Sequence, residues 1–269
     1  MKTIALRILI ISAAISSHAV AQVAKQISSL PAIITKPGRY VLNKDLVLKK
    51  VAEAAITITV DDVKLDLGGH VISQTDAAGA DVYGIHAPFR GGISVFNGTI
   101  RGFNIGIRIN CYQSAATDLT MENLHVEACR TVGIQASGLS GTVRRCVVAD
   151  TGKGGTNAAY GINLDLGFAT VLDNTVTGTV GATGHSYGMF GSAQAGVIEG
   201  NRILNDANTH GEIGIRLGGG VSELVENNRI CGFLTGIEFT PGAKAVYRNN
   251  LTTDCTTKYT LGTDAGNNK

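Results

Sequence analysis

Two short patterns of apolar and polar residues alternate along the chain. The first is a glycine followed by an apolar residue, a variable residue and usually a second apolar residue, as in residues 161–164. The second is an apolar residue, two variable residues, a turn residue, one more residue, and then Ile, Val or Leu, as in residues 171–176. Both are short, have an apolar period of two and are rich in β-branched residues, so each predicts a strand.

The first pattern recurs at a nearly constant interval. Its glycines are spaced by 22, 27, 28, 27, 26 and 22 residues: Gly84, Gly106, Gly133, Gly161, Gly188, Gly214 and Gly236. Repeats of this length are typical of solenoids, in which each repeat forms one coil. After the first 21 residues no window shows a sustained helical stripe, and the frame of a leucine-rich repeat is missing. The sequence therefore predicts an all-β protein, a parallel β-helix of roughly eight or nine coils.

The alternation also predicts which side chains face outward. If Ile162 and Leu164 face the core, then Asn163 and Asp165 face solvent. The glycines of the first pattern are expected to face outward as well and to leave a shallow floor. Asparagine tolerates left-handed backbone, and its amide can bond the next coil, so the turn asparagines of the second pattern predict a structural ladder. These are Asn174, Asn201, Asn228 and Asn249.

Three consecutive coils carry longer loops. The counts from each turn residue to the next glycine are 8, 9, 15, 14, 13 and 8, and the long intervals fall in residues 147–160, 175–187 and 202–213. Since coils stack, these loops should build a wall at one corner, beside the outward row of the glycine pattern. A trough with amides, a carboxylate and a guanidinium suits an extended polyhydroxylated chain, so the predicted partner is a polysaccharide or oligosaccharide.

Two sets of candidate residues lie in this trough and its wall. The candidate catalytic residues are Asp165, His185, His210, Glu212 and Arg216. The candidate substrate-binding residues are Arg108, Gln135, Lys153, Asn163, Phe190 and Glu238. The Arg216 guanidinium is expected to hold a sugar carboxylate with two parallel hydrogen bonds, which favours an acidic glycan.

Several chemistries stay open for these residues. Asp165 and Glu212 would serve as the two carboxylates of a glycoside hydrolase. His185 or His210 would serve as the base of a polysaccharide lyase, with Arg216 neutralising charge. Alternatively, the long loops are tolerated insertions and the protein is a non-catalytic envelope scaffold or glycan-binding protein.

No cofactor is predicted. Asp165 has Ser137 and Ser192 at the equivalent positions of the neighbouring coils instead of carboxylates, which argues against a Ca²⁺ site. A zinc or copper site from His185, His210 and Glu212 is a minor alternative.

The repeats resemble the right-handed parallel β-helix proteins of the pectin-lyase-like superfamily, and more narrowly its exported bacterial group with carbohydrate-binding and sugar-hydrolysis repeats. The resemblance covers about residues 34–265 and includes the phrases at residues 34–42 and 63–70. It implies right-handed coils. This superfamily contains lyases, hydrolases, epimerases, adhesins and inert scaffolds, so the resemblance implies the fold and leaves the activity open.

The catalytic phrases of specific families in this superfamily are missing. Polygalacturonases pair adjacent aspartates in mid-chain with a Gly-His-Gly phrase, whereas here the adjacent pair, Asp61 and Asp62, lies early and residues 184–186 read Gly-His-Ser. Alginate epimerases use an Asp-Pro-His phrase that this sequence does not contain. Whether the protein is an enzyme therefore stays open.

The beginning of the chain predicts export. Residues 1–21 combine Lys2 and Arg7, an apolar run and a final Ala-Val-Ala, which is the order of a cleavable signal peptide. We expect residues 22–33 to form an N-terminal cap or leader, residues 34–265 to form the β-helix domain, and the mature protein to be secreted or periplasmic. No later run is long and apolar enough to span a membrane.

Composition adds three constraints. The chain of 269 residues is 44% hydrophobic and 16% charged, so it can bury a continuous core. Without residues 1–21 it has 21 basic and 21 acidic residues, which gives no general attraction to nucleic acid. Of five cysteines, Cys231 and Cys255 have a near-repeat spacing that predicts a disulfide.

Tyr160 and Tyr187 occupy equivalent positions of neighbouring repeats, and we expect their rings to stack in the core. The oligomeric state stays open.

Overall fold

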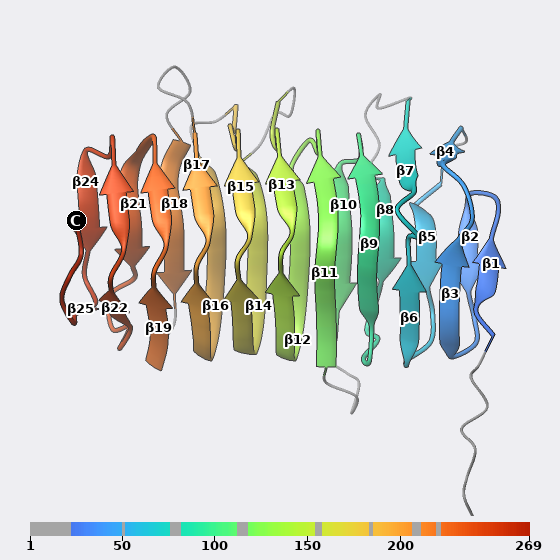
Figure 1. Ribbon diagram of the computed structural model, residues 1–269, viewed down its shortest axis with the longest axis horizontal. Helices are drawn as coiled ribbons and strands as arrows, with labels where there is room; N and C mark the ends of the chain where they lie inside the picture. Colours follow the sequence, from blue (N-terminus) through green and yellow to red (C-terminus); the bar gives the residue numbers. More distant parts are fainter. Residues whose placement is uncertain are drawn as a thin grey trace, which may run out of the picture.

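The computed structural model describes residues 23–49, 52–75, 82–111, 118–153, 158–182, 185–205, 211–218 and 222–269. Every regular element in these ranges is a β-strand, and strands of successive coils lie side by side along the long axis, from blue at one end to red at the other (Figure 1). The coils form a parallel β-solenoid of about eight turns, as the repeat predicts. Among the described residues there is no helix of the length and apolarity needed to cross a membrane. The predicted signal peptide, residues 1–21, lies outside them.

The solenoid has three faces, and each face is a column of parallel strands paired in register. Face A contains the glycine pattern. Its strands are β2 (Ala32–Ile34), β5 (Ala54–Ile58), β8 (Tyr83–Ala87), β10 (Ile105–Asn110), the first parts of β12 (Val132–Arg144), β14 (Ala159–Leu172) and β16 (Ser186–Glu199), then β18 (Gly211–Gly218), β21 (Phe233–Phe239) and β24 (Thr257–Thr260).

Face B follows face A in each coil. It consists of β1 (Lys25–Ile27), β3 (Gly38–Leu42), β6 (Val63–Asp66), the first parts of β9 (Ser94–Arg101) and β11 (Asp118–Glu127), the last parts of β12, β14 and β16, then β19 (Ser222–Glu226), β22 (Val246–Arg248) and β25 (Thr263–Asp264).

Face C completes each coil with short strands. They are β4 (Leu46–Leu48), β7 (Val71–Gln74), the ends of β9 and β11, β13 (Val147–Ala149), β15 (Thr175–Thr177), β17 (Arg202–Leu204), β20 (Arg229–Cys231) and β23 (Leu251–Thr253). The predicted long loops follow β13, β15 and β17, at the corner between faces C and A. The predicted N-terminal leader, residues 22–33, contains β1 and the start of β2, which pair with β3 and β5.

Inward side chains of equivalent position stack into rows that fill the solenoid. One row on face A is at most 3% exposed and follows the strand register: Ile56, Ile85, Ile107, Ile134, Ile162, Met189, Ile215 and Ile237. Burying each such side chain contributes about 1.5–3 kcal/mol. Because the row continues from coil to coil, every coil depends on its neighbours for the apolar surface that it buries.

The glycines of the first pattern face the core, and the prediction that they face outward is wrong. All seven are buried. A Cβ atom on Gly161 would lie 2.4 Å from Val176 Cγ1, and one on Gly188 would lie 2.2 Å from Ile203 Cγ2. Val176 and Ile203 are the inward residues of the short face C strands β15 and β17. Glycine is needed because the chain enters face A in close contact with face C.

An asparagine ladder runs between faces B and C. The Asn174 N–H donates to Asn201 Oδ1 at 2.9 Å, and the Asn201 N–H donates to Asn228 Oδ1 at 3.0 Å. The ladder then continues to Asn250 and Asn268, each of which accepts the N–H of the ladder residue before it at 3.0 Å. Each amide Nδ2 also donates to the backbone carbonyl of a face B residue in the preceding coil, as from Asn201 to Val171 O at 2.9 Å.

The prediction that Asn249 belongs to this ladder is wrong by one residue. Asn249 is exposed and has a φ of 56°, whereas Asn250 is 1% exposed and holds the ladder position. In the last full coil the inward residues are Tyr247 and Thr252, which pair with Val225 and Ile230 of the preceding coil. The outward Val246 and Leu251 fit the second sequence pattern as well, one residue before the inward positions, and this is why the sequence predicted Asn249.

The predicted bridge between Cys231 and Cys255 does not form, and both residues are free thiols. Cys231 ends strand β20, where its register partner in the next coil is Thr253 rather than Cys255. The Cys231 Sγ donates to Asp254 Oδ2, and the Cys255 Sγ donates to the Thr253 carbonyl, both at 3.4 Å. Near-repeat spacing therefore brought the cysteines to neighbouring coils but two positions out of register.

Candidate functional site

The outward side chains of face A form the row that the sequence predicts. The register places in one line His86, Arg108, Gln135, Asn163, Phe190, Arg216 and Glu238. A second outward row, two residues farther along each strand, contains Asn110, Ser137, Asp165, Ser192 and Gly218. Each row therefore repeats one position of the coil along the whole face.

Part of these two rows encloses a groove of about 370 Å³, which we call groove A. Its polar and aromatic lining residues are Arg108, Asn110, Gln135, Ser137, Asn163, Asp165, Phe190 and Ser192. They come from β10, β12, β14 and β16, four adjacent strands of face A. Since neighbouring strands are about 4.8 Å apart, groove A follows the solenoid axis for about 14 Å.

The polar groups of groove A are held in place by bonds between coils. Asp165 Oδ1 accepts a hydrogen bond from Ser192 Oγ at 2.7 Å, and Ser137 Oγ donates to Asn110 Oδ1 at 3.1 Å. Gln135 Oε1 is buried and has no hydrogen-bond partner in the described part of the chain. An unpaired buried acceptor is costly, so this amide favours a ligand hydroxyl as its partner.

Two arginines of the outward row lie over tyrosine rings. The Arg108 guanidinium is 5.4 Å from the Tyr83 ring centroid, and Arg108 Nη1 donates to Tyr83 Oη at 2.7 Å. Arg216 is 5.8 Å from the Tyr187 ring centroid, and its Nη1 donates to Tyr187 Oη at 3.2 Å. The two differ in charge balance, because Arg216 Nε also pairs with Glu238 Oε1 at 3.1 Å. Arg108 therefore suits a ligand carboxylate better than Arg216, the residue chosen from the sequence.

Tyr160 and Tyr187 stack as predicted, with ring centroids 5.2 Å apart, and Tyr187 is buried, but neither ring belongs to the apolar cluster inside the solenoid. Both rings contact Phe190 of the outward row, at 5.4 and 5.2 Å between centroids. Each tyrosine precedes a glycine that faces the core, which puts the tyrosine ring on the outer side of face A. Burial raises the pKa of Tyr187, and the negative charge of Glu212 raises it further.

His185 and Glu212 form a pair at the loop end of face A. The distance between His185 Nδ1 and Glu212 Oε2 is 2.8 Å, and the Glu212 N–H donates to Ser186 Oγ at 3.0 Å. His185 is mostly exposed. Neither residue lines groove A. Within the described residues no group of three His, Cys, Asp or Glu side chains is placed to hold a metal ion.

The predicted catalytic residues that the structure describes therefore do not meet at one point. Asp165 lies in groove A, while Glu212 and His185 pair at the loop end and Arg216 pairs with Glu238 beside Tyr187. His210 lies outside the described residues.

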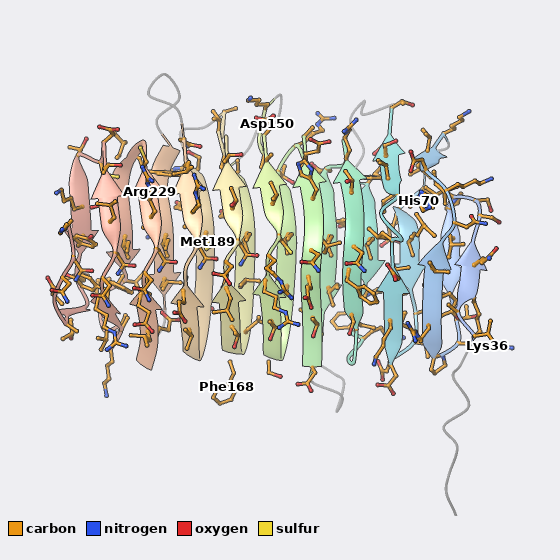
Figure 2. All side chains as sticks on the ribbon, in the orientation of Figure 1. Lys36, His70, Asp150, Phe168, Met189 and Arg229 are labelled. Carbon is orange, nitrogen blue, oxygen red and sulfur yellow. The ribbon has the colours of Figure 1, made fainter. Side chains whose placement is uncertain are left out.

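The predicted binding residues divide in the same way. Arg108, Gln135, Asn163 and Phe190 line groove A, whereas Glu238 does not. Lys153 Nζ pairs with Asp150 Oδ1 at 2.7 Å at the corner between faces C and A, and Figure 2 labels Asp150.

Three aromatic residues on or beside face A were not among the sequence-predicted site residues: Tyr83, Tyr187 and Phe168. Tyr83 and Tyr187, which contact Arg108 and Arg216, each stand one residue before a glycine of the first pattern. An alignment of the repeats on these glycines would have shown the recurring tyrosine. Phe168, three residues after Asp165, is 64% exposed and projects away from the molecule at the corner between faces A and B (Figure 2). It stands outside both repeated patterns, so the alternation gave no sign of its direction.

Comparisons with known proteins support the fold. A family model described as a right-handed beta-helix region matches residues 44–191. Among solved structures, the chain is similar to full-length tailspike protein 2 from Escherichia coli O157:H7 bacteriophage CAB120, with 15% identity and a TM-score of 0.53. The match covers 91% of this chain and 37% of that one, and at this identity it concerns the fold alone. A search of curated proteins found no match to the sequence.

Proposed function

The chain belongs to the right-handed β-helix family, and from this premise we propose that it binds a polysaccharide lengthwise in groove A. The supporting observation is that groove A takes its polar side chains from equivalent positions of four adjacent coils. It therefore presents hydrogen-bonding groups at regular intervals along the axis. A linear glycan presents hydroxyl groups at regular intervals too, so the two repeat in the same direction.

Each kind of side chain in groove A has a part in this proposal. The amides of Gln135 and Asn163 donate to and accept from sugar hydroxyls. The Phe190 ring offers an apolar surface to a sugar ring. Arg108, which has no carboxylate partner in the described structure, would bind the carboxylate of an acidic sugar. In this proposal the preference for an acidic glycan depends on Arg108 rather than on Arg216.

Binding without cleavage is the function that this geometry favours. Hydrolysis of a glycosidic bond commonly uses two carboxyl groups on opposite sides of that bond, and the lining of groove A includes one, Asp165. We further propose that the protein acts outside the cytoplasm, secreted or periplasmic, on the basis of the signal-peptide pattern in residues 1–21.

Cleavage by elimination is a second candidate, favoured by the His185–Glu212 pair. An imidazole held by a carboxylate at 2.8 Å is a suitable base, and Arg216, four residues after Glu212 on strand β18, is the candidate for neutralising developing charge. In this case the scissile residue would lie at the loop end of face A, beyond groove A.

Titration calorimetry with a panel of neutral and acidic oligosaccharides tests the binding proposal. Gln135→Ala and Asn163→Ala should each weaken binding of the best ligand about tenfold, since each removes hydrogen bonds to a hydroxyl group of the bound sugar. Asn43→Ala removes an exposed amide far from groove A and should leave affinity unchanged. If no glycan binds, or if the groove variants bind as well as the wild type, the proposal is wrong.

Product analysis separates the two candidates. For cleavage, the wild type should generate reducing ends and the absorbance of unsaturated products, and His185→Ala and Glu212→Gln should abolish both while binding persists. For binding alone, no product should appear with any ligand of the panel.

A further inference from the structure

Face B carries a second groove, separate from groove A. It has a volume of about 410 Å³ and is lined by Arg39, Lys64, Ser94, Phe96, Thr120 and Glu122. We call it groove B. These residues come from β3, β6, β9 and β11, four adjacent strands, and occupy two rows of the register. Groove B therefore also follows the solenoid axis, near the N-terminal end of the molecule.

Groove B contains two adjacent positive charges that the protein itself does not balance. Arg39 and Lys64 are register partners on neighbouring strands, and both are exposed. Neither side chain has a hydrogen-bond or ion-pair partner in the part of the chain that the structure describes. Two unpaired cations side by side repel each other, so a ligand with matching negative charges would relieve this repulsion.

Two acidic residues lie at or near groove B, and one of them, Glu122, is paired with arginines. Glu122 Oε2 pairs with Arg144 Nη2 at 2.6 Å, and Glu122 Oε1 pairs with Arg145. Asp66 lies two residues after Lys64, and its Oδ1 accepts the Gly68 N–H at 2.9 Å. A bond from a neutral N–H leaves the Asp66 charge in place, so over β3 and β6 the two cations Arg39 and Lys64 face one carboxylate, and this part of groove B keeps a positive excess.

The remaining lining residues suit a sugar. Phe96 is half-buried and forms a flat apolar wall, and the hydroxyl-bearing Ser94 and Thr120 follow Lys64 in the same row. A sugar ring has an apolar face for an aromatic ring and hydroxyl groups for hydrogen bonds. Cations, an aromatic wall and hydroxyl groups together match an acidic sugar better than a simple anion.

We propose that groove B binds an anionic glycan, with sugar carboxylates on successive residues held by Arg39 and Lys64. Neighbouring strands are about 4.8 Å apart, which is comparable to the length of one sugar residue in an extended chain. A polyuronate lying along the axis would then place one carboxylate at each cation. This proposal does not depend on groove A, because the two grooves share no residue and lie on different faces.

Adjacent cations alone do not define such a site. Arg202 and Arg229 on face C are also exposed register partners, and Figure 2 labels Arg229. Their neighbours in the same row are Thr175 and Leu251, without an aromatic wall. This pair therefore provides a matched control, because its removal changes the net charge by the same amount.

The test is binding of an end-labelled oligogalacturonate, followed by fluorescence anisotropy at low ionic strength. The double variant Arg39→Gln with Lys64→Gln should bind at least tenfold more weakly, since it removes two charge-assisted contacts. Phe96→Leu, which keeps apolar volume but loses the flat ring, should weaken binding several-fold. The double variant Arg202→Gln with Arg229→Gln should bind like the wild type. Unfolding midpoints of all variants establish that each is folded.

Several outcomes would overturn the inference. An equal loss in both double variants would reduce it to general charge attraction. Equal binding of a poly-glutamate peptide, or of the carboxyl-reduced oligosaccharide, would exclude an anionic glycan as the specific ligand. Loss of oligogalacturonate binding in Asn163→Ala but not in the Arg39 and Lys64 variant would place all binding in groove A. That last result rejects groove B and leaves the proposed function intact.

Discussion

Asn201 makes four side-chain hydrogen bonds, all inside the solenoid. Its Oδ1 accepts from the Asn174 N–H and from Asn174 Nδ2, and its Nδ2 donates to Val171 O and to Asn228 Oδ1. Closer to the N-terminus the same position holds Gly98, Leu124 and Cys146, and the ladder is replaced by small or apolar residues. At the residue scale, the hydrogen-bonded asparagine ladder is therefore confined to the C-terminal part of the solenoid, from Asn174 to Asn268.

We expect Asn201→Ala to lower the free energy of unfolding by about 3 kcal/mol, because it leaves the buried N–H groups of Asn174 without acceptors. Asn249→Gly is the matched control, since Asn249 is exposed and glycine accepts its positive φ; its effect should stay below about 1 kcal/mol. Urea denaturation of both variants measures the difference. An Asn249 variant as unstable as the Asn201 variant would contradict the corrected ladder.

His86 is expected to make folding stability depend on pH. It is 7% exposed, and burial lowers its pKa; nearby Arg108 lowers the pKa as well, while Glu53, 3.0 Å away, raises it. The folded state therefore binds fewer protons at this site than the unfolded state. The stabilisation is complete above about pH 6.5, the ordinary histidine pKa, and is lost as the pH falls below it.

Denaturation curves at pH 5, 6 and 7 test this expectation. His86→Asn should flatten the fall in stability between pH 7 and pH 5 relative to the wild type. His125→Asn, which removes a more exposed imidazole on face C, should keep the slope of the wild type. Identical slopes in the wild type and in His86→Asn would show that His86 has no part in the pH dependence.

At the scale of elements, the corner between faces C and A has a buried glycine in seven consecutive coils, from Gly84 to Gly236. We expect Gly188→Ala to cost about 3 kcal/mol of stability, since the new Cβ would lie 2.2 Å from Ile203 Cγ2 and 2.7 Å from the Gly214 carbonyl. Gly218→Ala on the same face should cost little, because its Cβ would meet Thr240 at 3.5 Å, an ordinary contact. Thermal unfolding compares the two. A tolerated Gly188→Ala would mean that face C can move away from the corner.

The sequence predicts elements well where they repeat and poorly where they do not. Period-two alternation and the spacing of Gly133, Gly161 and Gly188 were enough to place the strands of face A and their register. The side occupied by Tyr187 could not be obtained in this way, because the inward glycine after it interrupts the alternation. His185 and Glu212 lie at the ends of loops outside the repeat, so their pairing depends on three-dimensional positions that no periodicity encodes.

At the scale of the whole molecule, each coil is stabilised by contact with the coils on either side. The end strands β1 and β25 each pair on one side only among the described strands. Local opening should therefore be easiest at both ends and hardest in the middle. We expect amide hydrogen exchange to be slowest in β12, β14 and β16 and fastest in β1, β2, β24 and β25. Uniform exchange along the chain would contradict this gradient and indicate a single all-or-none opening.

Each asparagine of the ladder reaches one coil and no farther, which bears on how such a protein can change its length during evolution. Asn201 bonds to Asn174 on one side and to Asn228 on the other, each 27 residues away. A tandem duplication of residues 175–201 would insert an identical asparagine between existing neighbours and leave no bond open. Duplication of one coil can therefore lengthen such a protein by one whole coil, without any change to the sequences at its two ends.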